Sequence, residues 1–114
     1  MQSPDMQRLK HIIEYCDAIA QTIQRYGATF ECYLEDPDYQ RSISFSILQI
    51  GELSAALSEE FRRQTQYAMP WREIKNMRSI VAHSYGHVDH KIVWNTANND
   101  IPELRAFCEA QIAQ

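Results

Sequence analysis

Apolar residues recur every three or four positions along most of the chain, which is the spacing of one face of an α-helix. The first stripe follows Ser3-Pro4-Asp5, a typical helix start because Ser caps the first turn and Pro fits its first position. Gly27 is a natural helix stop, so the pattern predicts a helix over residues 4–26. Its apolar positions are Met6, Leu9, Ile12, Ile13, Cys16, Ile19, Ala20, Ile23 and Tyr26.

A second start signal, Asp36-Pro37-Asp38, predicts a helix that runs to about Arg63. This helix is apolar on two sides, so it either lies at the centre of a bundle or packs one side against another subunit. From this feature we expect a homodimer. One stripe comprises Ile43, Ile47, Ile50, Leu57 and Phe61, interrupted by Ser54, and the second set comprises Phe45, Leu48, Ala55 and Ala56.

Gly51 and Glu52 lie in the middle of this helix. A helical Gly costs about 0.5–1 kcal/mol relative to Ala, which indicates that another helix approaches closely there. Glu52 is either a buried acid in that apolar setting or an ordinary side chain that reaches solvent.

The last fifty residues carry three further helix signals after a polar loop over residues 64–69. Pro70 starts a helix that Gly86 should stop, and Asp89 can cap a helix beginning at His90. Asp100 and Glu103 resemble a capping box, so we expect a kink or break near Asn99 and a last helix after it. The stripes are Trp71, Ile74, Met77 and Val81, then Ile92, Val93 and Ala97, then Leu104, Phe107, Cys108 and Ile112.

The number and type of these elements predict the fold class. No stretch alternates apolar and polar residues as a strand does, and no repeat or linker separates the helices. The chain of 114 residues is long enough for one packed core but not for two. We therefore expect a single domain over residues 1–114, an all-α, up-and-down bundle of four or five helices.

Composition indicates a cytoplasmic protein without membrane contact. No apolar run approaches the roughly 18 to 20 residues of a membrane span, and the first ten residues lack the pattern of a signal peptide. Three cysteines without C-x-x-C spacing are typical of reduced thiols in the cytoplasm: Cys16, Cys32 and Cys108.

The net charge of −4 argues against broad, sequence-blind binding of nucleic acid. The charge is unevenly distributed, however, because residues 72–91 carry a net +2 before any histidine is protonated. A local site for an anion is therefore compatible with an acidic protein. The charged residues of this segment are Arg72, Lys75, Arg78 and Lys91, against Glu73 and Asp89.

The segment over residues 78–87 holds the chain's densest group of reactive side chains. Arg78 offers a planar fork of donors that matches a phosphate, and His83 titrates near neutral pH. Such a pair suits metal-independent RNA cleavage, in which the ribose 2′-OH attacks the phosphate, Arg stabilises the growing charge and His transfers a proton. The same pair would also suit phosphate binding without catalysis.

The helical geometry does not bring these groups together by itself. On a straight helix Arg78 and His83 lie about 140° apart around the axis, whereas Arg78 and Tyr85 nearly share a face. Convergence requires the helix to end close to His83, or a second copy of the helix to complete the site across a twofold axis.

Two other interpretations remain open for these residues. In the first, Arg78 pairs with a carboxylate such as Glu52, His83 caps a helix end and Tyr85 packs in the core. In the second, His83, His87 and His90 bind a metal with Asp89, although Gly86 and the cap at Asp89 break the helix that such a site needs.

The sequence Arg78-Ser79-Ile80-Val81-Ala82-His83-Ser84-Tyr85 resembles the R-x4-H-x-Y signature of HEPN-domain ribonucleases, specifically the HepT toxin family. The flanking segments are similar too, and the resemblance covers about residues 5 to 110. The similar segments are Ile50-Gly51-Glu52, Trp71-Arg72-Glu73-Ile74-Lys75-Asn76-Met77, Val93-Trp94 and Asp100-Ile101-Pro102-Glu103-Leu104.

The resemblance implies an all-helical homodimer that cleaves RNA without metal or cofactor, as the toxin of a type VII-like toxin–antitoxin system. It implies that Arg78 and His83 are the catalytic pair, in a cleft at the dimer interface. It also implies neutralisation by a cognate minimal nucleotidyltransferase, which transfers AMP from ATP onto Tyr85.

One position departs from the family pattern. The family often has Asn, Asp or His directly after the Arg, whereas this chain has Ser79, which has a shorter reach. The alternative function is therefore a non-catalytic HEPN bundle that binds a nucleotidyltransferase partner or a nucleotide.

Overall fold

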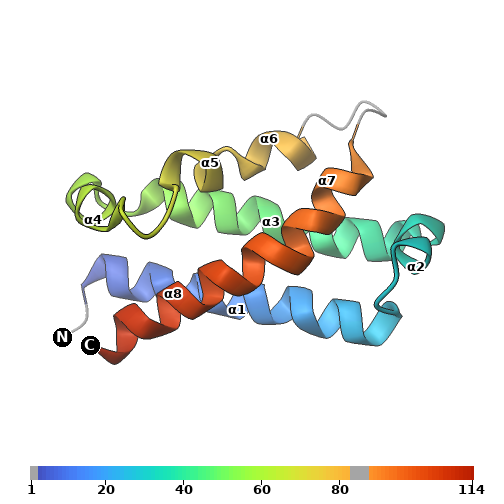
Figure 1. Ribbon diagram of the computed structural model, residues 1–114, viewed down its shortest axis with the longest axis horizontal. Coiled ribbons are helices and arrows are strands. Elements are labelled where there is room, and N and C mark those ends of the chain that lie inside the picture. The colour runs from blue at the N-terminus through green and yellow to red at the C-terminus, as the bar shows by residue number, and fades with distance from the viewer. Residues whose placement is uncertain (1–2, 83–87) are drawn as a thin grey trace.

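Two long helices, α1 (Pro4–Tyr26) and α3 (Pro37–Ala56), run side by side along the length of the molecule (Figure 1). The structure, a computed structural model, describes residues 3–82 and 88–114. The shorter helices pack on this pair: α5 (Trp71–Lys75) and α6 (Met77–Ala82) lie along α3, and α8 (Ile101–Ala113) crosses α1 (Figure 1). The helical elements found among the described residues confirm the all-α fold class.

Local capping explains where α1 begins and ends. The backbone N–H of Met6 donates to Oγ of Ser3 at 3.1 Å, as the sequence predicts. Gly27 ends the helix with a φ of +114°, a conformation that other residues rarely adopt. The Tyr39 hydroxyl donates to the Gly27 carbonyl at 3.0 Å, so the turn is also held by α3.

The prediction of one helix from Pro37 to about Arg63 was wrong. Helix α3 ends at Ala56, Leu57 has extended backbone with a ψ of 146°, and α4 (Glu59–Thr65) begins afresh. Ser58 caps α4, and the Asp5 carboxylate accepts from both the N–H and the hydroxyl of Ser58, at 2.8 and 2.5 Å. A side chain from α1 therefore contacts the break directly. The apolar spacing did not reveal the break, because Leu57 is buried although it lies outside the helix.

A short helix that the sequence did not reveal, α2 (Phe30–Glu35), joins α1 to α3. Thr29 caps it, since the backbone N–H of Cys32 donates to the Thr29 hydroxyl at 3.2 Å. Tyr33 is fully buried and packs against the rings of Tyr39 and Trp94. Six residues are too few to form a recognisable apolar stripe.

The third predicted helix starts as expected but is divided at Asn76 into α5 (Trp71–Lys75) and α6 (Met77–Ala82). Its predicted stripe is confirmed, because Trp71, Ile74, Met77 and Val81 are buried. The Trp71 indole N–H donates to the Thr65 hydroxyl at 2.8 Å, which ties α5 to the end of α4. The predicted stop at Gly86 lies outside the described residues.

The chain is helical from His90 to Ala113, so the kink or break predicted near Asn99 is not an interruption of the helix but a change to a π-helical turn. Asp89 caps α7 (His90–Asn95) as predicted, and a π-helical turn, η1 (Thr96–Asp100), connects α7 to α8. Asp100 makes no side-chain cap; the Ile101 N–H instead donates to the Thr96 carbonyl, five residues back. Pro102 disfavours a regular turn here, because it lacks an N–H and its ring crowds the carbonyl four residues earlier.

The second apolar set of α3 does not belong to the core. Phe45 is 56% exposed, Ala56 is exposed, and Leu48 and Ala55 are half-buried. The buried face of α3 is instead formed by Tyr39, Ile43, Ile47 and Ile50. Within the described ranges, none of the helices combines the length and the apolarity that crossing a membrane requires.

Candidate functional site

Arg78 lies in the first turn of α6, with its side chain 37% exposed. Its Nε donates to the backbone carbonyl of Lys75 at 3.1 Å, and one terminal nitrogen donates to Oε1 of Glu52 at 3.2 Å. The carbonyl fixes the direction of the side chain, while the planar guanidinium remains at the surface. A guanidinium held in this way can present donors to a phosphate.

The absence of a side chain at Gly51 leaves room for the side chain of Arg78 against α3. A Cβ added at Gly51 would lie 2.5 Å from Cγ of Arg78 and 3.3 Å from its backbone nitrogen. The close helix approach predicted from Gly51 is therefore confirmed, and the helix that approaches is the one carrying Arg78. Any side chain at this position would displace Arg78 or α6.

The predicted alternatives for Glu52 are now resolved. Its side chain is 56% exposed, so it is not a buried acid, and it pairs with Arg78 as the structural interpretation predicted. An exposed pair of this kind contributes about 0–1 kcal/mol. The Arg78–Glu52 contact is therefore weak enough for an incoming phosphate to replace the carboxylate.

The other predicted site residues, His83 and Tyr85, lie outside the described residues, as does His87. Their convergence with Arg78 therefore stays a prediction. Ser79, the position that departs from the family pattern, is exposed on α6.

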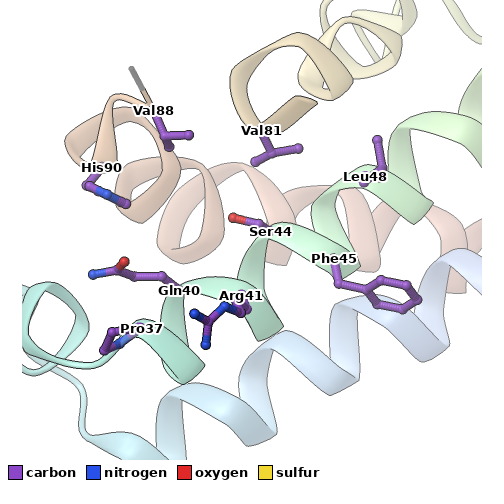
Figure 2. A pocket seen from close by; sticks show the side chains of 9 residues that line it. All are labelled: Pro37, Gln40, Arg41, Ser44, Phe45, Leu48, Val81, Val88 and His90. Atoms are coloured by element: carbon purple, nitrogen blue, oxygen red, sulfur yellow. The ribbon is translucent and has the colours of Figure 1, made fainter. Parts of the chain in front are cut away.

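A hollow of about 560 Å³ lies on α3 where the described chain stops after α6 and resumes before α7. Val81 lines it from one side and Val88 and His90 from the other, and all three face α3 across the hollow (Figure 2). The floor from α3 consists of Pro37, Gln40, Arg41, Ser44, Phe45 and Leu48. Two residues of the second apolar set of α3, Phe45 and Leu48, therefore border the same hollow as Val81, which belongs to the signature.

His90 is engaged with a buried tyrosine. Its Nδ1 lies 2.9 Å from the Tyr33 hydroxyl. Burial raises the pKa of Tyr33 to about 12, with a smaller contribution from neighbouring Tyr39, so the hydroxyl stays protonated and can donate to the imidazole. This contact orients the His90 ring at the edge of the hollow.

The metal-site hypothesis receives no support from the described part of the chain. There, no three His, Cys, Asp or Glu side chains gather closely enough to hold an ion. His83 and His87 lie outside those residues, so the hypothesis itself stays untested.

The described helices form an all-α bundle, and the R-x4-H-x-Y sequence begins at Arg78 on its surface. This combination is the one found in an all-α HEPN bundle. The model of the family described as "Ribonuclease HepT-like" matches residues 12–111, and the chain belongs to this family.

Relatives of similar length carry related names. A protein of Caldanaerobacter subterraneus subsp. tengcongensis named "Putative RNase" is 35% identical over 96 residues, which cover 84% of this chain and 83% of that protein. The "Probable ribonuclease HepT" of Thermococcus cleftensis is 32% identical over 101 residues, covering 84% and 91%. A "Putative RNase" of Methanocaldococcus jannaschii is 27% identical over 97 residues, covering 85% and 78%. No solved structure shows a significant match to the chain.

Proposed function

We propose that this protein is a metal-independent RNA endonuclease in which Arg78 and His83 form the catalytic pair. The observation that carries the proposal is the placement of Arg78. A backbone carbonyl orients its side chain, and its ion pair with Glu52 is exposed and weak. In the sequence, His83 follows five residues later. Membership of a ribonuclease family and the names of the relatives support the same chemistry.

In the proposed reaction, the guanidinium of Arg78 binds a non-bridging oxygen of the scissile phosphate and stabilises the charge that develops there. His83 takes the proton of the 2′-OH and passes it to the leaving 5′-oxygen. The 2′-oxygen forms a bond to phosphorus as the bond to the 5′-oxygen breaks, so the products are a 2′,3′-cyclic phosphate and a 5′-hydroxyl. We propose that two subunits contribute these groups to one cleft.

The test is cleavage of labelled tRNA and mRNA by purified protein in EDTA, followed by identification of the end groups. We expect cleavage with a 2′,3′-cyclic phosphate, and its loss in His83→Ala with an unchanged circular dichroism spectrum. His11→Ala is the matched control, since His11 is an exposed histidine on α1. Equal RNA degradation by wild type and His83→Ala would refute the assignment.

We further propose that the protein acts as a toxin and that a cognate minimal nucleotidyltransferase neutralises it by transferring AMP from ATP onto the Tyr85 hydroxyl, with release of pyrophosphate. An AMP group beside Arg78 would occupy the phosphate site with its own negative charge and exclude RNA. Incubation with such an enzyme and ATP should add the mass of AMP to wild type but not to Tyr85→Phe. Expression without the partner should arrest growth; growth at the rate of His83→Ala cells would contradict the toxin role.

The alternative function is a non-catalytic bundle that binds a nucleotidyltransferase or a nucleotide, favoured by Ser79 at the position after Arg78. In that case Arg78→Ala would weaken binding of the partner, and wild type would not cut RNA.

A further inference from the structure

A second group of cations lies between α4 and α5. A pocket of about 680 Å³ is lined there by Arg62, Arg63, Arg72 and Lys75, with Glu59 and Glu73 as its acidic side chains. Four of the chain's eleven Lys and Arg residues therefore gather in one hollow of a protein with net charge −4. Such a local excess of positive charge favours an anionic ligand.

These cations form no ion pair with the described residues. Within residues 3–82 and 88–114, none of the ion pairs involves Arg62, Arg63, Arg72 or Lys75, although Glu59 and Glu73 lie in the same pocket. The Nε of Arg62 is buried and has no hydrogen-bond acceptor in that part of the chain. A buried donor without a partner is costly, and native structures usually satisfy it with protein, water or a ligand.

The pocket is adjacent to the candidate active site. Lys75 lines the pocket, and its backbone carbonyl accepts the hydrogen bond from Nε of Arg78 at 3.1 Å. A ligand bound at the pocket would thus lie on the turn of helix that precedes Arg78. Arginine forks match phosphate oxygens, and the pocket's aromatic residue, Trp71, is only 5% exposed and does not offer a face for stacking a base.

We propose that this pocket is a second phosphate site, which binds the backbone of the RNA at a nucleotide flanking the scissile phosphate. The inference rests on the proposed ribonuclease function, because RNA is its ligand. Contacts to phosphate alone carry no base information, so the pocket raises affinity and fixes register without adding sequence specificity.

The experiment measures binding of fluorescent single-stranded RNA by anisotropy, in the His83→Ala background so that the RNA stays intact. Arg62→Gln, Arg63→Gln and Arg72→Gln should each raise Kd at least about tenfold at low salt, as expected for a lost charge-assisted hydrogen bond. Each should also reduce the slope of log Kd against log salt by about 0.7, the value for one phosphate contact on a single strand. The losses should be equal for RNAs of different sequence.

Arg25→Gln is the matched control, because it removes one positive charge from the end of α1 opposite to α4 (Figure 1). Arg62→Lys keeps the charge, so it should recover part of the affinity and the full salt slope. Thermal melting checks that each variant folds, and the Arg63 and Arg72 variants test the site should Arg62→Gln fail to fold.

The outcomes separate this proposal from the proposed function. If wild type cuts RNA but the pocket variants bind it no worse than Arg25→Gln, the second phosphate site is refuted and the function stands. If the pocket variants lose RNA affinity and salt dependence but wild type does not cut RNA, the pocket stands as a site for the RNA backbone, whereas catalysis and a position next to a scissile phosphate are refuted.

Discussion

At the scale of single residues, Gly51 controls where Arg78 can lie. Gly51→Ala gains about 0.5–1 kcal/mol of helix propensity, but its Cβ would meet Cγ of Arg78 at 2.5 Å. The two effects oppose each other, so we expect a change in unfolding free energy of within about 1 kcal/mol. If Arg78 is catalytic as proposed, RNA cleavage should nevertheless fall at least about tenfold, because small displacements of a catalytic group are costly.

A double-mutant cycle with Arg78→Ala tests the cause of that effect. Removing Cγ of Arg78 relieves the shortest contact, so Gly51→Ala should be more stabilising in the Arg78→Ala background than in wild type. The measurement is urea unfolding of the four proteins. Strict additivity would mean that Gly51 and Arg78 do not interact as the structure indicates.

Two cysteines are protected by the core. Burial raises the pKa of Cys16 and of Cys108 to about 12, and for Cys16 the proximity of Cys108 adds to the effect. We expect Ellman's reagent at pH 8 to modify only Cys32, which is half-buried, until urea unfolds the chain. In Cys32→Ser, Ellman's reagent should modify no thiol of the folded protein. Modification of this folded variant would show that another cysteine is reactive.

The same thiols make stability dependent on alkaline pH. In the folded protein their pKa lies above the ordinary value of 9.0, so between about 9 and 12 the unfolded chain releases protons that the folded chain keeps. Stability is therefore full below pH 9 and falls as pH rises, by about 1.4 kcal/mol per pH unit for each thiol. Urea unfolding at pH 8 to 10 should show this decline, and it should be shallower in Cys108→Ala.

At the scale of elements, the contact between Asp5 and Ser58 decides where α3 ends and α4 begins. Ser58→Ala removes both the cap of α4 and a partner of Asp5, so it should cost about 1–2 kcal/mol. Asp5→Ala should cost a similar amount, and the double variant less than the sum, because both remove one shared contact. Ser44→Ala on α3 is the control, since its hydroxyl makes no hydrogen bond with the described residues; an equal loss there would rule out a capping effect.

Helix starts could be predicted wherever a cap and an apolar stripe agree, as at Ser3, Asp36 and Asp89. The predictions failed where a distant contact or a short element decides the backbone path. Asp5 lies 53 residues from Ser58 in the chain, so no local pattern contains their hydrogen bond. Helix α2 has only six residues. Before α8, the backbone hydrogen bond of the π turn replaces the capping box predicted at Asp100.

The candidate site was predictable to the extent that it is local in sequence. Arg78 was identified from the signature, and its partner Glu52 from the carboxylates available in the chain. Arg62 and Arg63 were missed, because they join Arg72 only when the break at Leu57 turns α4 back toward α5. Charge counted along the sequence therefore underestimated the positive surface beside Arg78.

At the scale of the whole molecule, the exposed apolar face of α3 is the surface through which we expect two copies to associate. Phe45 is 56% exposed and borders the hollow together with Leu48 and with Val81, a residue of the signature. Pairing of this face would bury Phe45 and bring the two signature segments toward each other.

Phe45→Glu should therefore convert the protein from a dimer of about twice 13.3 kDa to a monomer with unchanged helicity. If the proposed cleft is shared between subunits, RNA cleavage should be lost together with dimerisation, because neither subunit alone completes it. Light scattering at micromolar concentration measures the mass, and Tyr67→Glu is the control, since Tyr67 is 83% exposed and does not line the hollow. A wild-type mass near 13 kDa, or a Phe45→Glu dimer that retains activity, would exclude this face as the interface and would remove the basis for a composite site there.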